Sequence, residues 1–201
     1  MLQHVRPAVV LLLLFSALTG LVYPLAVTGI AQVAMPRQAN GSLIEKGGVV
    51  VGSALIGQNF KTDKYFHPRP SATTDTDPND AIKTIDAPYN AANSTGSNLG
   101  PTSQKLVDRV KAGVEAWRKM AGPGPVPADA VTTSASGLDP DVSPSTALAQ
   151  VPSVAKARGL PEDKVRALVE GAIERPVFGL IGEPRVNILR LNLALDRLKS
   201  S

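Results

Sequence analysis

The sequence predicts an α+β protein with a single N-terminal transmembrane helix, followed by one soluble domain that has a small sheet and several helices. Two observations support this prediction. A charge-free apolar stretch lies between Arg6 and Arg37, and no second stretch of this kind follows it. Behind it, β-branched runs alternate with segments of helical periodicity. We therefore divide the chain into a tail at residues 1–6, a transmembrane anchor at 7–36 and a soluble domain at 37–201.

The anchor is longer than a bilayer requires, because about 20 helical residues span a hydrocarbon core of roughly 30 Å. A cleaved signal peptide is the rival interpretation, supported by the small residues of Gly29-Ile30-Ala31. Its apolar region is normally about 7–15 residues long, so the length favours an uncleaved anchor. Pro24 should kink or end the first straight segment. Gly20 and Gly29 are small enough to admit a neighbouring helix, or are ordinary transmembrane residues.

Composition excludes several classes of site. The chain has no cysteine, so disulfides, thiolate metal sites and cysteine nucleophiles are excluded. The formal net charge is +4, and much of the excess lies on one predicted helix, as on an ordinary solvated face. Nucleic-acid binding would need interleaved aromatic residues or a known motif, and neither is present. Basic residues flank the anchor on both sides, so charge alone does not fix its orientation.

The first half of the domain is poor in periodicity. The β-branched run Gly47–Gly57, cut by glycines, predicts one or two short strands. Two prolines keep Tyr65–Ala72 extended or turning. Thr73–Pro88 and Tyr89–Thr102 are rich in turn-forming residues and are interpreted as loops. Loops of this length in a compact domain are usually functional or disordered.

A clear amphipathic helix follows, with its apolar residues three and four positions apart and its charges on the other face. These apolar residues are Leu106, Val107, Val110, Val114, Trp117 and Met120. The proline-rich stretch Gly122–Pro127 should end this helix. The run Val131–Ser136 is interpreted as a strand.

The last third predicts helices with clear ends. Ser143 is a suitable N-cap, Pro144 suits the first helical position, and Gly159 suits the residue after the end. Pro152 lies inside this helix and should kink it or split it in two. A second helix is expected over Pro161–Ala172.

The C-terminal elements complete the predicted order. Val186–Leu189 is interpreted as a strand, and Asn192 as the N-cap of a last helix that extends through Leu198.

Catalytic motifs are incomplete. A serine hydrolase needs a nucleophile, a base and an orienting group. His4 precedes the anchor, so His67 would be the only base, and no Gly-x-Ser-x-Gly turn exists. The glycine-rich run Gly96–Thr102 lacks the lysine of a phosphate-binding loop. We expect no catalytic residue, and His67 is interpreted as a loop histidine.

A calcium-binding loop is the nearest match to a metal site. Asp75, Asp77, Asn79 and Asp86 occupy positions 1, 3, 5 and 12 of that spacing. However, Asp80 stands where the sharp turn requires glycine, and Lys83 places a positive charge near the ion. We therefore expect no metal site and interpret the segment as an acidic surface loop.

Several stretches together resemble a known family. The soluble part is similar to the KdpC family, which supplies one subunit of the Kdp-type potassium-transporting ATPase. The similarity also covers the anchor and the segment Gln38–Ile44, and so nearly the whole chain. The matching runs in the domain are Gly52–Phe60, Tyr65–Ala72, Tyr89–Ala91 with Gly96–Gly100, Val131–Pro140, Val154–Leu160 and Gly182–Asp196.

The resemblance implies a non-catalytic accessory subunit of an ATP-driven potassium uptake pump. Its partners would be a potassium-translocating subunit, a P-type ATPase subunit, a further small subunit of the same complex and membrane lipid, with no nucleic acid. ATP and potassium would be handled by the partner subunits, so no cofactor is expected on this chain. The alternatives from other classes are a membrane-anchored extracytoplasmic binding or envelope protein unrelated to transport, and an anchored hydrolase that uses His67.

Two roles belong to the resemblance. One is assembly and stability of the complex. In this role the chain would be a single-pass protein of the inner membrane, and its domain would cap the potassium-translocating subunit outside the cytoplasm. The other is a catalytic chaperone that raises the ATP affinity of the ATPase subunit, for which Gln150 is the candidate nucleotide contact. Ser153 stands where the family usually has arginine. Candidate partner contacts are Tyr65, Phe66, Arg69, Pro70, Tyr89, Asn90, Asn98, Leu99, Gly20 and Gly29.

Overall fold

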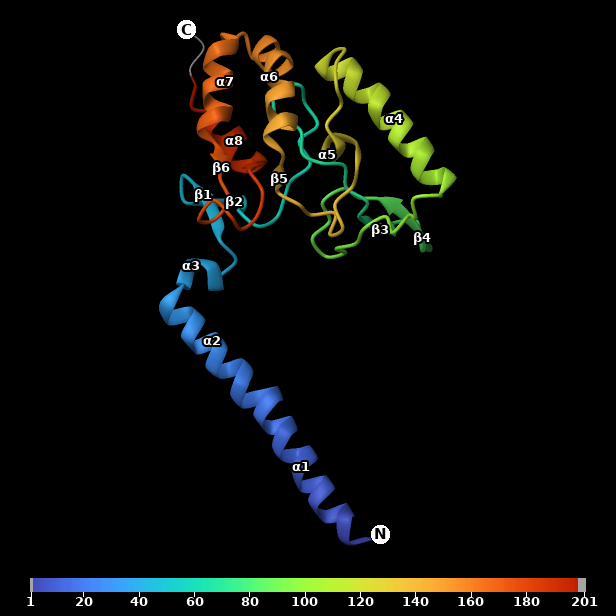
Figure 1. Ribbon diagram of the computed structural model, residues 1–201, viewed down its shortest axis with the longest axis vertical. Coiled ribbons are helices and arrows are strands. Elements are labelled where there is room, and N and C mark those ends of the chain that lie inside the picture. The colour runs from blue at the N-terminus through green and yellow to red at the C-terminus, as the bar shows by residue number, and fades with distance from the viewer. Residues whose placement is uncertain (1, 199–201) are drawn as a thin grey trace. The chain divides into compact units, whose positions relative to one another are not determined.

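The computed structural model describes residues 2–198 and divides the chain into two compact units, residues 1–53 and 54–201 (Figure 1). It confirms the predicted α+β class, with one apolar N-terminal helix followed by small sheets and several helices. Each unit is described by itself.

A continuous apolar helix dominates the first unit. It runs from Val5 to Ala34, follows a short 3-10 turn (η1, Leu2–His4), and is long and apolar enough to cross a membrane. A π-helical turn, η2 (Leu18–Val22), separates α1 (Val5–Ala17) from α2 (Tyr23–Ala34). This interruption ends two residues before Pro24, which lacks the amide that an α-helical turn would use.

A short hairpin completes this unit. After α3 (Pro36–Ala39), strands β1 (Leu43–Lys46) and β2 (Val49–Ser53) pair antiparallel around two glycines. Gly47 and Gly48 both have positive φ, a conformation that glycine adopts without a steric penalty. The strand predicted within Gly47–Gly57 is thus β2.

The core of the second unit is built from three helices and a small sheet. Strands β5 (Asp141–Val142), β7 (Arg185–Asn187) and β6 (Ile173–Glu174) form an antiparallel sheet in that order. Helices α6 (Pro144–Arg158) and α7 (Glu162–Gly171) lie side by side, and α8 (Ile188–Leu195) packs against α7 (Figure 1). The buried core is Phe66, Val142, Ala147, Val151, Val154, Ala155, Leu160, Val165, Val169, Val186, Ile188, Leu191 and Leu195.

The ends of α6 follow the predicted chemistry. The Ser143 hydroxyl accepts a hydrogen bond from the Thr146 amide at 3.1 Å, and Gly159 adopts the left-handed conformation at the C-terminus. Pro152 lies inside the helix without splitting it, so that part of the prediction was wrong. The side chain of Pro152 is exposed, which leaves its ring room on the outer face.

Three other sequence predictions were wrong. Val131–Ser136 forms no strand: α5 (Ala128–Val131) ends there, and bends follow it. The predicted loop Thr73–Pro88 contains a hairpin of β3 (Thr74–Asp77) and β4 (Asp80–Asp86). The last helix is capped by Asn187, whose side chain accepts from the Arg190 amide, rather than by Asn192. The amphipathic helix predicted around Trp117 is present as α4 (Gln104–Ala121).

Candidate functional site

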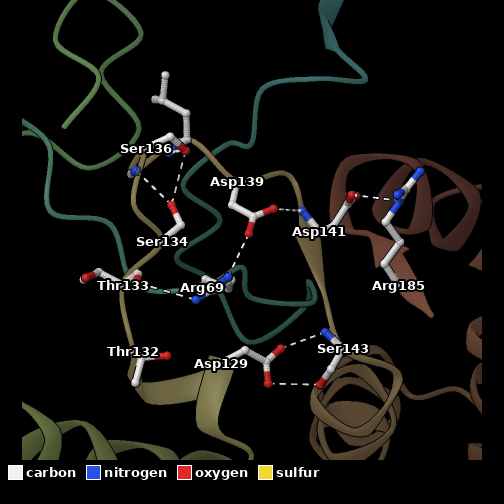
Figure 2. Close-up of polar contacts among 12 residues, drawn as sticks. Arg69, Asp129, Thr132, Thr133, Ser134, Ser136, Asp139, Asp141, Ser143 and Arg185 are labelled. Carbon is white, nitrogen blue, oxygen red and sulfur yellow. Dashed lines mark hydrogen bonds and ion pairs between the residues drawn. The ribbon is translucent and has the colours of Figure 1, made fainter. Parts of the chain in front are cut away.

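The loops of the second unit meet in a charged cleft of about 400 Å³. Figure 2 shows most of its side chains, which come from the extended segment before β3, from α5, from β5 and the turn before it, from the N-cap of α6, and from β7. The cleft is lined by Arg69, Ala128, Asp129, Asp139, Asp141, Val142, Ser143, Glu183, Pro184 and Arg185. Family-resembling runs that are far apart in the sequence therefore converge here.

Arg69 joins two of these runs. Its guanidinium donates to Asp139 Oδ2 at 2.9 Å and to the Thr133 carbonyl at 3.5 Å (Figure 2). The side chains of Arg69 and Asp139 are only 23% and 28% exposed. Removing one partner of such a pair leaves a largely buried charge uncompensated. The pair therefore fixes the segment Tyr65–Ala72 against the turn before β5.

Asp129 organises the start of α6 from another element. Its carboxylate accepts from the Ser143 amide at 2.7 Å, the Ser143 hydroxyl at 3.0 Å and the Thr146 hydroxyl at 2.7 Å. Burial acts to raise the pKa of Asp129, but these hydrogen bonds outweigh it and hold the pKa below its usual range. Asp129 is therefore an ionised group that binds α5 to the N-terminus of α6.

Asp141 lies in a different electrostatic environment. Burial raises the pKa of this carboxyl, and the hydrogen bond from Asn187 and the charge of Arg185 only partly oppose the shift. Asn187 Nδ2 donates to Asp141 Oδ1 at 3.1 Å and to the Ala54 carbonyl at 3.0 Å. Asn187 thus connects β5, β7 and the first residue of the second unit, while its oxygen caps α8.

Tyr89 closes the cluster on the side of the extended segment. Its hydroxyl donates to the Arg69 carbonyl at 2.8 Å. Burial, aided by the charge of Asp139, raises its pKa. A Cβ on Gly57 would lie 2.4 Å from the Tyr89 ring and 2.6 Å from the Asp139 carbonyl, so only glycine fits there. The family-resembling run around Gly57 is explained by this close approach.

The chemistry of the cleft is that of a fixed charged surface. Its aspartates are each held by an internal cation or hydrogen-bond donor. Among the residues described, Ser143 donates directly to Asp129, and neither histidine lines the cleft. A nucleophile activated by a base needs a different arrangement. The cleft is therefore a set of charges that are paired within the domain.

Two buried amides hold the extended segment from the inside. Gln150 on α6 accepts from the His67 amide at 2.7 Å and donates to the His67 carbonyl at 3.1 Å. Asn192 on α8 does the same for Phe66, at 2.9 Å and 3.0 Å. We call these two contacts the amide clamps. Each clamp bonds the amide and the carbonyl of one residue, Phe66 or His67, which lies outside any strand.

Gln150 was the candidate for nucleotide contact. Its side chain is buried, and its amide is used by the His67 backbone and the Thr146 carbonyl. Contact with a nucleotide would require breaking the clamp. Gln150 as a nucleotide contact stays a prediction. Its hydrogen bonds to the His67 backbone give it a structural role that needs no ligand.

The candidate partner contacts differ in accessibility. Phe66 is 0% exposed and belongs to the core, so its side chain offers no surface to a partner. Tyr65 stacks under Arg158, whose guanidinium lies 4.6 Å from the ring centre. Asn90 Nδ2 donates to the Thr74 carbonyl at 3.0 Å.

The remaining candidates are half-buried or exposed. Pro70 and Leu99 are half-buried, and Asn98 is exposed with a positive φ. Gly20 and Gly29 have open space around the position of a Cβ. All of these contacts stay predictions.

Ser153, His67 and the acidic hairpin each form hydrogen bonds within the second unit. The Ser153 hydroxyl donates to the Met120 carbonyl, so it links α6 to the end of α4 where the family usually has arginine. His67 Nε2 lies 3.2 Å from the Thr62 carbonyl, within its own loop. Asp75 and Asp77 accept hydrogen bonds from amides of their own hairpin, at Thr76 and Asn79 respectively.

Sequence reasoning missed Asp129, Asn187 and the clamping role of Asn192. The signal for Asn187 was present, because an asparagine directly before an apolar helical run is a common N-cap. Asp129 and Asn192 act on residues distant in the sequence, which no local pattern indicates. An exposed apolar turn, residues 177–181, was also missed.

Comparisons with known proteins agree over nearly the whole chain. A family model described as KdpC, the c chain of the K+-transporting ATPase, matches residues 5–197. A protein of Bradyrhizobium diazoefficiens is 63% identical over 197 residues, covering 98% of each chain. Proteins of Rhodopseudomonas palustris and Methylobacterium nodulans are each 62% identical, also over 98% of both chains. All three relatives are called the KdpC subunit of a potassium-transporting ATPase.

Proposed function

The chain belongs to the KdpC family, and from that premise we propose that it is a non-catalytic accessory subunit of an ATP-driven potassium uptake pump. In this proposal it assembles with three partners, which are a potassium-translocating subunit, a P-type ATPase subunit and a further small subunit. Its task is to assemble and stabilise the complex. The observation that carries the proposal is the family match over residues 5–197, which includes both the apolar helix and the soluble unit.

The side chains of the second unit support a structural task. The charged cleft, the amide clamps and the close approach at Gly57 all fix loop backbones in place. Loops held by a rigid scaffold are a common form of recognition surface. Gln150 is already bonded to His67, which weighs against direct nucleotide contact and favours the assembly role over the chaperone role.

Reconstitution tests the accessory role. We expect the three partner subunits purified without this chain to show little potassium-stimulated ATP hydrolysis, and we expect the added chain to restore it in lipid. The chain alone should hydrolyse no ATP. Full potassium-stimulated turnover without the chain would contradict the proposal. Arg69→Gln, which removes the charge that balances Asp139, is a variant whose reduced rescue would point to the cleft.

We further propose that the soluble domain lies outside the cytoplasm of an inner-membrane protein. The resemblance supports this orientation, and the similar number of basic residues on either side of the anchor permits it. An outward domain is placed to dock on the potassium-translocating subunit and is separated from cytoplasmic ATP.

Protease added to intact spheroplasts should therefore remove the soluble domain, while the anchor stays in the membrane. A cytoplasmic protein probed in the same sample controls for lysis. Full protection in spheroplasts together with cleavage in inverted vesicles would contradict this orientation and would support the ATP-chaperone role.

A further inference from the structure

An apolar turn projects between β6 and β7 in the second unit. We call residues Val177–Ile181 the apolar loop. Its large side chains are exposed, with Phe178 at 90% and Leu180 at 87%, and Val177 and Ile181 beside them are more than half exposed. Buried apolar area is the main source of binding free energy in water. A contiguous set of exposed aliphatic and aromatic side chains indicates a surface that another apolar phase covers.

Most backbone amides of the apolar loop are already hydrogen-bonded. Val177 and Ile181 form an isolated bridge, with N–H···O distances of 2.9 Å and 3.0 Å. The amides of Gly179 and Leu180 donate to the Pro176 and Val177 carbonyls, at 3.0 Å and 3.1 Å. In a medium that lacks water, unpaired backbone amides carry a large free-energy cost. Four of the five amides of the loop avoid this cost.

The base of the loop is polar and fixed. Glu174 on β6 and Arg185 on β7 pair across the strands, with a 3.1 Å contact between their side chains. Arg190 also contacts Glu174, at 3.0 Å, and Arg175 is exposed beside the loop. An apolar tip above a charged base matches the polarity gradient from acyl chains to lipid headgroups.

The start of the second unit and the apolar loop lie at opposite ends of β7. Asn187 on β7 donates to the carbonyl of Ala54, the first residue of that unit, at 3.0 Å. The other end of β7 connects to the loop through residues 182–184. Ala54 itself follows the anchor after only a short segment that doubles back as β1 and β2. The chain therefore tethers the second unit to a helix that is long and apolar enough to cross a membrane.

We propose that the apolar loop inserts into the lipid surface on the side of the membrane where the domain lies, as a second contact besides the transmembrane helix. Lipid is favoured over a protein partner because the side chains of the loop carry no hydrogen-bonding group, whereas the binding hot spots of protein interfaces are enriched in Trp, Tyr and Arg. The insertion would restrict the rotation of the soluble domain relative to the transmembrane helix.

Spin labelling of the full-length chain in lipid vesicles tests this proposal. The sequence has no cysteine, so Leu180→Cys and Phe178→Cys each give a single attachment site for a nitroxide. Ile82→Cys on β4 is the matched control, because Ile82 is a large apolar residue that is 96% exposed. The vesicles contain phosphatidylcholine and phosphatidylglycerol and none of the other pump proteins.

The labels at 178 and 180 should lose accessibility to a water-soluble nickel complex and gain accessibility to oxygen, while the label at 82 remains accessible to nickel. Equal nickel accessibility at all three positions would overturn the proposal. Protection at 178 and 180 that appears only when the pump subunits are added would also overturn it, and would assign the loop to a protein contact. Because the experiment in vesicles uses this chain alone, its outcome is independent of whether the pump assembles.

Discussion

Replacing Asn192 with leucine should lower the free energy of unfolding of the soluble domain by about 2–5 kcal/mol. Leucine has a similar size but neither accepts nor donates, so both backbone groups of Phe66 lose their partner in a buried position. Each buried polar group left unsatisfied costs about 1–3 kcal/mol. For a chain of this size, 1 kcal/mol corresponds to roughly 2–4 °C in Tm. The shift is therefore measurable by thermal unfolding in mild detergent.

Gln150→Leu tests the second amide clamp in the same way, on the His67 backbone. Matched controls are Asn59→Leu and Gln104→Leu, because both side chains are exposed. The controls should leave Tm within about 2 °C, since exposed substitutions usually change stability by less than about 0.5 kcal/mol. A clamp variant as stable as its control would show that water replaces the lost hydrogen bonds.

Enlarging two glycines of the anchor should abolish assembly of the pump while leaving the chain folded. Nothing lies within 4 Å of a Cβ built on Gly20 or Gly29, so Gly20→Leu and Gly29→Leu are accommodated by the chain itself. Close packing of transmembrane helices depends on small residues at the contact. A leucine at such a contact would hold the neighbouring helix away from the anchor.

The measurement is the amount of the potassium-translocating and ATPase subunits that co-purifies with the tagged double variant. Leu21→Ile on the same helix preserves volume and is the control. Membrane retention and the Tm of the soluble domain should be unchanged in both variants. Normal co-purification of the double variant would show that assembly depends on other surfaces of the chain.

Local sequence patterns predicted the elements whose ends are chemically marked. Ser143, Pro144 and Gly159 set the bounds of α6 because capping and left-handed conformations act over a few residues. The long apolar helix was predictable because its length and lack of charge can be read directly from the sequence. In each case the information lies within one turn or one continuous stretch.

The secondary-structure predictions were wrong where contacts between distant segments determine the local conformation. The β-branched residues around Val131 suggested a strand, but this segment ends α5, and Val131 packs against Gly113 of α4. The segment Thr73–Pro88 lacks an apolar face, so its strands could not be inferred from alternation. Among the residues described, they pair with each other, around an Asp77 side chain that accepts from the Asn79 amide.

The candidate site was least predictable at its buried polar residues. Asparagine is equally suited to capping a helix and to bonding a distant backbone, so the sequence near Asn192 suggested the wrong role. Arg69 and Asp139 are 70 positions apart in the sequence, and their ion pair depends on the path of two loops. The family resemblance marked these runs as important, but it did not indicate that they meet in one cleft.

The most direct test of the central claim is purification of the full-length chain in mild detergent from cells grown in low potassium. The account predicts that the potassium-translocating and ATPase subunits elute with the chain in one complex, and that this complex hydrolyses ATP when potassium is added. A chain that elutes alone under conditions that keep those two partners together would contradict its assignment as a subunit that assembles the pump.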